Sequence, residues 1–287
     1  MTAAQKIIKW FAYGLAAVLV FSILTAIVAA GAGILTAVGI ISGGAPETIS
    51  CEGYEKCLNL ELSYSELQIK KGDKLAVETS DDDYEITKDD NKLVVKDKKK
   101  SNWFGGNSNR KVTVTVPSDM VFDAVGIGNG AGKIEIDYLY AKELTLSVGA
   151  GETIVDEIKV TKKAKIDTGA GKFEIKNGVK INDAKVSLGV GETKIRAALT
   201  GEAKIDAGIG SVNLELLMME SDYKIKVDKG IGEIRFNGST VGNGTIGNGE
   251  NEIDVDGGIG SINITTATES VLPVIEEAED KTKDIKE

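Results

Sequence analysis

Apolar and polar residues alternate along most of the chain after residue 57. From Gly132 onward, apolar residues stand at positions 134 and 136 and then at positions 144, 146 and 148. A period of two is typical of β-strands that have one buried and one exposed face. Residues 58–122 alternate less regularly, and Pro117 directly follows one such run, so we expect them to open the same β domain.

A Gly-x-Gly motif marks a repeat of this pattern. Its first glycine stands at positions 130, 149, 169, 189, 208, 230 and 258, which gives steps of 19, 20, 20, 19, 22 and 28 residues. Two short strands and two turns in about 20 residues would form one coil of a solenoid, and neighbouring coils would bury what a single coil cannot. We expect each motif at a corner, where a positive φ or a close backbone approach excludes a Cβ atom. The predicted fold is an all-β parallel β-solenoid of at least seven coils, with two short strands in each.

The residue after the second glycine indicates the length of one coil. In chain order these residues are Lys133, Glu152, Lys172, Glu192, Ser211, Glu233 and Ser261. If each unit of about 20 residues is one coil, the lysines stack beside glutamates, whereas a coil of about 40 residues would stack like charges. The alternation favours the shorter coil, although duplication of a two-coil unit would produce the same order of charges.

A long apolar segment precedes the alternating part. Residues 10–41 carry no charge over 32 positions. A helix needs about 20 residues to cross the hydrocarbon core, whereas the apolar region of a secretory signal is usually about 7–15 residues long. The length therefore predicts one transmembrane helix over residues 10–42. A signal peptide that is cleaved after Ala30 is the alternative.

The charges beside this segment predict its orientation. Lys6 and Lys9 precede it, whereas three glutamates follow it before the next lysine, Lys56. Because positively charged flanks stay on the cytoplasmic side, residues 1–9 are expected in the cytoplasm and the β domain outside. The predicted localisation is the cell membrane, crossed once.

The other domain boundaries follow from composition. Residues 43–57 would be a juxtamembrane linker, residues 58–270 the β-solenoid, and residues 271–287 a charged tail that loses the repeat. The linker holds both cysteines of the chain, Cys51 and Cys57. Outside the cytoplasm they could form a local disulfide, and two free thiols are the alternative.

Composition and motif context argue against several classes of function. The chain has no histidine, which removes Ser/His/Asp triads and His-ligated metal sites, and its net charge of −10 argues against a nucleic-acid partner. Residues 126–131 fit a dinucleotide-binding spacing, but a strand follows them where a helix is needed. The acidic clusters at 81–83 and 254–256 lack the regular spacing of calcium-binding β-rolls. We therefore expect no enzymatic activity, no cofactor and no metal site.

One basic stretch differs from the acidic remainder of the chain. Residues 96–111 hold six basic residues and one acid, Asp97, for a net charge of 6 − 1 = +5, with two of the chain's few aromatic residues between them. Such a loop suits anionic lipid headgroups or an anionic wall polymer. The candidate surface-binding residues are Lys98, Lys99, Lys100, Trp103, Phe104 and Arg110. The alternative is that the aromatic pair covers an open end of the solenoid.

The stretches "NKLVVKDKKKSNWFGG" and "KVTVTVPSDMVFDAVGIGNGAGKIEI", followed by the glycine-marked units, carry a family resemblance. Over roughly residues 60–265 the chain resembles the bacterial putative adhesin family of β-strand repeat proteins, a domain of unknown function. The resemblance implies the repeat fold and no catalytic residue. The membrane-anchored arrangement is similar to envelope proteins of Gram-positive bacteria that are linked to cell-envelope stress.

Two functional hypotheses follow. In the first, the chain is a membrane-anchored extracellular module that binds or adheres within the bacterial cell envelope without catalysis, through an anionic cell-wall polymer or lipid headgroups. In the second, it is the ectodomain of an envelope-stress sensing or scaffolding system that acts through a membrane protein partner.

Overall fold

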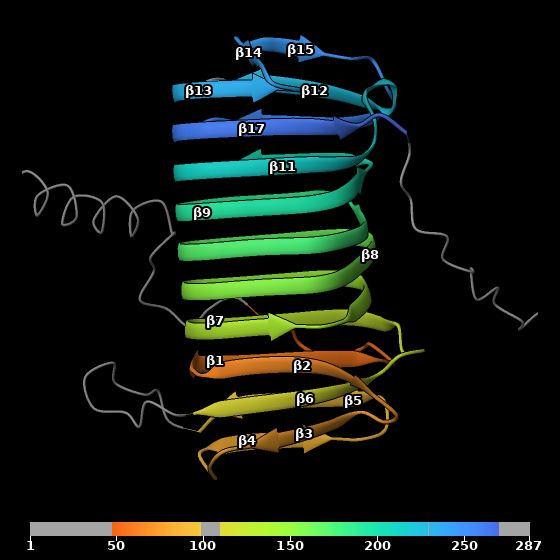
Figure 1. Cartoon of the computed structure of the whole chain (residues 1–287). Coiled ribbons are helices and arrows are strands. Elements are labelled where there is room, and N and C mark those ends of the chain that lie inside the picture. The colour runs from red at the N-terminus through yellow and green to blue at the C-terminus, as the bar shows by residue number, and fades with distance from the viewer. Residues whose placement is uncertain (1–47, 99–109, 229, 270–287) are drawn as a thin grey trace, which may run out of the picture. The chain divides into compact units, whose positions relative to one another are not determined.

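The computed structural model describes residues 48–98, 110–228 and 230–269 of the chain, all within the compact unit Pro46–Glu287. These residues form an all-β structure of 17 strands and one short 3₁₀ helix, Glu220–Asp222 (Figure 1). The predicted span over 10–42, the residues 1–9 and the tail 271–287 lie outside the described residues. Within the described ranges, no helix has the length and apolar character needed to cross a membrane.

The strands follow one another from the N-terminal to the C-terminal end of the domain. The first seven are β1 Cys57–Tyr64, β2 Glu66–Gly72, β3 Ala76–Thr79, β4 Tyr84–Lys88, β5 Lys92–Asp97, β6 Lys111–Pro117 and β7 Phe122–Ile136. The others are β8 Leu139–Asn182, β9 Ala184–Thr200, β10 Glu202–Asp206, β11 Ile209–Met219, β12 Tyr223–Asp228, β13 Ile231–Phe236, β14 Ser239–Val241, β15 Gly244–Ile246, β16 Asn251–Asp256 and β17 Ile259–Ala267. Strand β6 ends at Pro117, as the sequence predicts.

Each coil has a first limb before its Gly-x-Gly motif and a second limb after it. Strand β7 pairs in parallel with β8 from Phe122 opposite Ala141 to Ile136 opposite Val155, on both sides of the motif. Two short strands per coil were predicted, but the ladder continues through the corner, so that β7 contains both limbs and β8 runs for 44 residues. The coil of about 20 residues is confirmed, since Lys133 lies opposite Glu152 and Lys172 opposite Glu192.

The core lies between the two limbs of every coil. Inward positions alternate with outward ones, and the inward aliphatic side chains are almost completely buried. Examples along the middle of the stack are Leu144, Leu146, Val155, Ile166, Phe173, Ile175, Val186 and Ile195. Burial of each such side chain stabilises the fold by about 1.5–3 kcal/mol, so the stack of coils supplies the core that one coil lacks.

The glycine motifs form the corners, as predicted. The second glycine of each motif has a positive φ, for example +132° at Gly151. A Cβ atom at Gly151 would overlap the carbonyl oxygen of Gly132 in the adjacent coil, and one at Gly149 would overlap that of Gly130. Both glycines are therefore needed for the coils to stack at strand spacing.

The N-terminal end of the stack does not follow chain order. Strands β1 and β2 lie between β7 and the outermost coil, which consists of β5 and β6. Strands β4 and β3 then pair antiparallel with β5 and β6 and cover that coil (Figure 1). The first coil of the chain is thus an inner coil.

The C-terminal end has the same arrangement, which corrects the expected order of the repeats. Strands β16 and β17 lie between the coil of β10 and β11 and the coil of β12 and β13. Strands β15 and β14 pair antiparallel with β12 and β13 at the outer edge. The motif that begins at Gly258 therefore stacks between those of Gly208 and Gly230.

Charge explains this insertion. Asp254 stands in register between Lys204 and Lys226, and the Lys226 Nζ lies 3.4 Å from an Asp254 carboxylate oxygen. If the coils stacked in chain order, the two lysines would be direct neighbours, which is unfavourable.

Candidate functional site

The structure describes two of the six predicted loop residues, Lys98 and Arg110. The others, Lys99, Lys100, Trp103 and Phe104, lie outside the described residues, so their role remains a prediction. The loop leaves the stack after β5 and returns at β6. Its position in the fold and the contacts at its base are therefore what the structure adds.

The loop occupies the corner of the outermost coil. In the adjacent coil the corner is Ser63–Ser65, and Tyr64 stands opposite Ala131, the middle residue of the first Gly-x-Gly motif. The Ser63 N–H donates to an Asp97 carboxylate oxygen at 2.6 Å, and the Glu66 N–H donates to the Arg110 carbonyl oxygen at 2.8 Å. Both ends of the loop are thereby fixed to the neighbouring corner.

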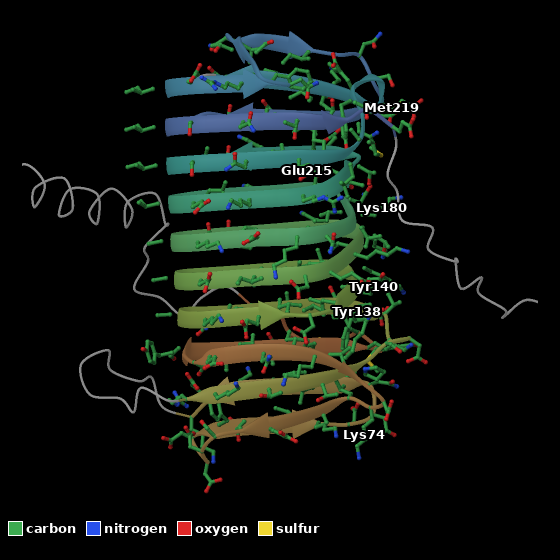
Figure 2. All side chains as sticks on the ribbon, in the orientation of Figure 1. Lys74, Tyr138, Tyr140, Lys180, Glu215 and Met219 are labelled. Atoms are coloured by element: carbon green, nitrogen blue, oxygen red, sulfur yellow. A yellow bond between two sulfur atoms is a disulfide. The ribbon has the colours of Figure 1, made fainter. Side chains whose placement is uncertain are left out.

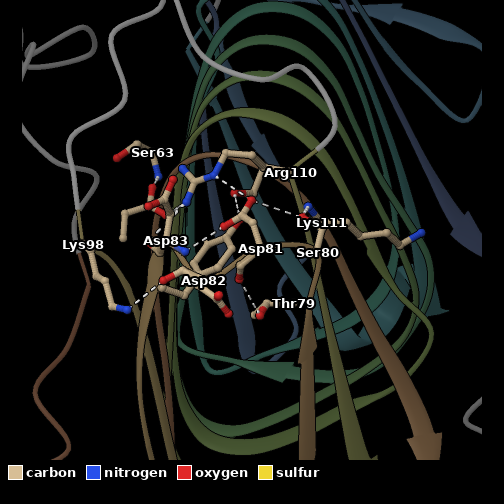
Figure 3. A network of polar contacts seen from close by, with 12 residues as sticks. Ser63, Thr79, Ser80, Asp81, Asp82, Asp83, Lys98, Arg110 and Lys111 are labelled. Atoms are coloured by element: carbon tan, nitrogen blue, oxygen red, sulfur yellow. Dashed lines mark hydrogen bonds and ion pairs between the residues drawn. The ribbon is translucent and has the colours of Figure 1, made fainter.

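Arg110 is buried at the base of the loop, with a 7% exposed side chain. Its Nη2 donates to Asp97 Oδ1 at 2.9 Å, its Nε lies 3.5 Å from Asp81 Oδ2, and its guanidinium stands 4.5 Å from the centre of the Tyr84 ring (Figure 3). Burial alone would lower the pKa of Arg110, but Asp97, Tyr84 and Asp81 raise it, so the guanidinium stays charged. Arg110 was predicted as a surface-binding residue, and the structure instead places it inside the fold as the partner of two carboxylates.

Lys98 is exposed and is tied to the turn between β3 and β4. Its N–H donates to the Asp83 carbonyl oxygen at 2.9 Å, and its Nζ donates to the Asp82 carbonyl oxygen at 2.7 Å (Figure 3). A lysine in this position still presents its charge to solvent beside the start of the loop. Lys98 therefore keeps the candidate role that Arg110 loses.

The three aspartates at 81–83 are explained by this turn. Asp81 Oδ1 accepts the Asp83 N–H at 2.9 Å, while Asp81 Oδ2 faces Arg110. Asp82 and Asp83 contribute carbonyl oxygens to Lys98. The part of the chain that the structure describes contains no group of three or more side chains suited to hold a metal ion.

A buried polar chain continues inward from the base of the loop. The hydroxyl groups of Ser65 and Tyr84 lie 2.8 Å apart, and the Asn129 Nδ2 donates to the Ser65 carbonyl oxygen at 2.8 Å. Burial raises the pKa of the Tyr84 hydroxyl. Sequence reasoning missed these residues, because single polar side chains among apolar ones give no periodic signal.

The segment before β1 is fastened to the first limbs of the stack. Cys51 and Cys57 are joined by a disulfide, with Cα atoms 5.5 Å apart. The Lys56 N–H donates to the Asp123 carboxylate at 2.9 Å, and the Tyr54 hydroxyl donates to Glu143 at 3.2 Å. The disulfide therefore lies where the described chain enters the domain.

Two adjacent tyrosines form a second polar feature that the sequence did not reveal (Figure 2). The ring centres of Tyr138 and Tyr140 lie 4.4 Å apart, and the Lys71 Nζ stands 4.2 Å from the centre of the Tyr138 ring. The Tyr138 hydroxyl donates to the Ser118 carbonyl oxygen at 2.6 Å. Burial, with smaller contributions from Glu157 and Asp119, raises the pKa of Tyr138 to about 12. The pair serves packing, because Tyr138 is only 4% exposed.

Parallel glycine-cornered coils, inserted terminal coils and antiparallel caps define a β-strand repeat domain. The chain matches the family described as Toastrack DUF4097 over residues 56–270 and belongs to that family. This confirms the resemblance to a β-strand repeat family of unknown function.

Two solved structures are similar to this chain. One is described as "a putative cell adhesion protein" from Clostridium sporogenes, with 17% identity and a TM-score of 0.30, over 77% of this chain and 97% of that one. The other is "a putative adhesin" from Bacteroides fragilis, with 14% identity and a TM-score of 0.30, over 76% of this chain and 95% of that one. None of the curated proteins matches the chain.

Proposed function

We propose that this protein is a non-enzymatic binding module of the bacterial cell envelope, anchored in the membrane by residues 10–42. Its binding element is the basic loop after β5, and its ligand is an anionic cell-wall polymer or an anionic lipid headgroup. The 32 uncharged residues at positions 10–41 support the anchor, and the excess of lysine in the loop supports the anionic ligand.

The fixed base of the loop carries this proposal. The ion pairs of Arg110 and the backbone hydrogen bonds of Ser63 and Glu66 hold both loop ends at the outermost coil. A loop of this composition at the corner position projects from the stack rather than lying inside the core. Holding its ends in place reduces the conformational entropy that is lost when the loop binds.

Sedimentation with purified ligands tests the proposal. Residues 46–287, which form one compact unit, are mixed separately with bacterial cell walls, anionic liposomes and neutral liposomes. The first variant is Lys98→Ser/Lys99→Ser/Lys100→Ser, and the second is Trp103→Ala/Phe104→Ala. Since each lysine near an anionic surface contributes about 1 kcal/mol, the triple variant should bind roughly a hundredfold more weakly.

A matched control removes the same charge elsewhere. Lys162, Lys163 and Lys180 are exposed and lie far along the chain from the loop. Their replacement by serine should leave sedimentation nearly unchanged. The proposal is wrong if the wild-type protein stays in solution with every ligand, or if the control variant loses as much binding as the loop variant. In the first case, the search would turn to a membrane protein partner.

A further inference from the structure

The middle residues of the Gly-x-Gly motifs form a row along the corner edge of the stack. In stacking order this row is Ala131, Ala150, Ala170, Val190, Ile209, Ile259 and Ile231. Its last four side chains are exposed by 40%, 48%, 51% and 74%. Among the described residues, eight large apolar side chains are exposed, and half of them stand in this one row.

The row is a continuous ridge. Val190 pairs with Ile209, Ile209 with Ile259, and Ile259 with Ile231, so consecutive side chains are about 4.8 Å apart. Glycines flank every member of the row and bear no side chains. A groove with about 620 Å³ of open space follows these glycines. Strands β11, β17 and β13 begin at this edge, on the left of Figure 1.

An exposed apolar ridge of this kind needs a covering surface. Isolated exposed aliphatic side chains are common, but four in succession along one edge are not explained by the fold of a single chain. The inserted coil places Ile259 between Ile209 and Ile231 and thereby makes the row continuous.

We infer that the corner ridge is a contact surface between two copies of this chain, packed antiparallel about a twofold axis. Size is the first reason. The ridge changes from alanine in the middle of the stack to isoleucine near its C-terminal end, so only an antiparallel partner sets large side chains against small ones. With the axis between the coils of Ala170 and Val190, these two face each other across copies, and Ile209 faces Ala150. A parallel arrangement would set isoleucine against isoleucine and leave a gap between the alanines.

Charge complementarity is the second reason. In an antiparallel pair, the second limbs of the two copies face each other. The first outward residue after the corner then places Lys172 of one copy beside Glu192 of the other, and Glu152 beside Ser211. The axis position that matches side-chain size therefore also brings opposite charges together.

The size of the ridge predicts a weak contact. It is one side chain wide, whereas a stable interface buries about 800 Å² on each partner. The pair is therefore expected to exchange, and to be populated where the copies are concentrated. For this reason the test uses covalent trapping of the full chain in its own membranes.

Cysteine cross-linking tests the arrangement. Two differently tagged full-length copies are co-expressed, one with Ala150→Cys and the other with Ile209→Cys, and the membranes are oxidised before non-reducing electrophoresis. These two positions face each other across the twofold axis, so a mixed dimer should form. Two copies of the same variant place their new cysteines three strand steps apart, about 14 Å, which is too far for a disulfide. Chains without new cysteines give the background from Cys51 and Cys57.

Each outcome decides the proposal. A mixed dimer without same-variant dimers supports it. Efficient cross-linking of Ala150→Cys with itself would indicate a parallel pair and overturn it, as would the absence of any product. The readout needs neither wall polymer nor lipid ligand, so its failure leaves the loop hypothesis intact.

A second measurement does not depend on cysteine chemistry. Tagged wild-type copies should co-purify from solubilised membranes, whereas Ile209→Asp/Ile259→Asp should lose co-purification. Ile86→Asp is the matched control, because Ile86 is 42% exposed and lies on β4, at the other end of the stack. Equal co-purification of all three proteins would refute the ridge as the contact.

Discussion

The two ends of the stack share one arrangement but hold it together with different side chains. At each end, the terminal coil of the chain is inserted next to the body of the stack, and the outermost coil bears two short antiparallel strands. An inserted coil pairs on both sides and presents no open edge, while short outer strands limit pairing with other chains. The same edge problem therefore has the same topological answer twice.

The chemistry of the two ends differs in burial. At the N-terminal end, Arg110 and Asp97 form an ion pair with side chains 7% and 5% exposed. At the C-terminal end, Lys224 and Glu252 pair with side chains 47% and 48% exposed, and Arg235 pairs with Glu233 at similar exposure. Surface pairs contribute about 0–1 kcal/mol, whereas breaking a buried pair costs about 3–5 kcal/mol. The N-terminal end thus depends on single residues, and the C-terminal end on backbone pairing.

The largest expected effect comes from the buried pair. Arg110→Met should lower the free energy of unfolding by about 3 kcal/mol, because Asp97 and Asp81 would lose their cation inside the fold. Urea unfolding of the purified domain measures this change as a lower midpoint. Arg235→Met at the other end is the control and should stay within about 0.5 kcal/mol of wild type. Equal losses at the two ends would contradict the comparison.

A smaller effect is expected in the hairpin turn of the C-terminal cap. Asn237 and Gly238 join β13 to β14 with φ values of 46° and 82°, the left-handed turn that suits a two-residue hairpin. A Cβ at Gly238 would meet nothing within 4 Å, so Gly238→Ala costs only backbone strain, about 1 kcal/mol.

Gly242→Ala is the control for this turn. A Cβ at Gly242 also meets nothing within 4 Å, and its φ is not positive. Thermal unfolding of both variants should show a lower midpoint for Gly238→Ala alone. Equal midpoints would mean that the turn conformation contributes nothing to the cap.

Hydrogen exchange sharpens the comparison without altering stability. Amides of residues 253–255 and 262–264 should be among the better protected, because β16 and β17 pair on both sides. Amides of residues 239–241 and 244–246 should exchange sooner, although they come earlier in the chain. At the other end, residues 58–61 should likewise outlast residues 84–88. Faster exchange in β16 and β17 than in β14 and β15 would show that the inserted coil opens first.

Much of the candidate site was readable from the sequence, and its base was not. The excess of lysine and the aromatic pair identify the loop, whose binding role stays a prediction, as does the membrane span. Arg110 was grouped with the loop lysines because charge alone does not reveal burial. Its partners Asp81 and Asp97 are 29 and 13 residues away in sequence, and only the pairing of β4 with β5 brings them to it.

The sequence by itself determined the strands, the glycine corners and the length of one coil. These are local properties, since a period of two sets the faces of a strand, and only glycine fits where a positive φ meets a neighbouring carbonyl group. The order of the outer coils was decided by tertiary structure. All coils share one apolar pattern, so the core accepts any order, and the choice depends on contacts between distant outward residues. Asp254 between Lys204 and Lys226 is such a contact, and it becomes visible only when the coils are stacked.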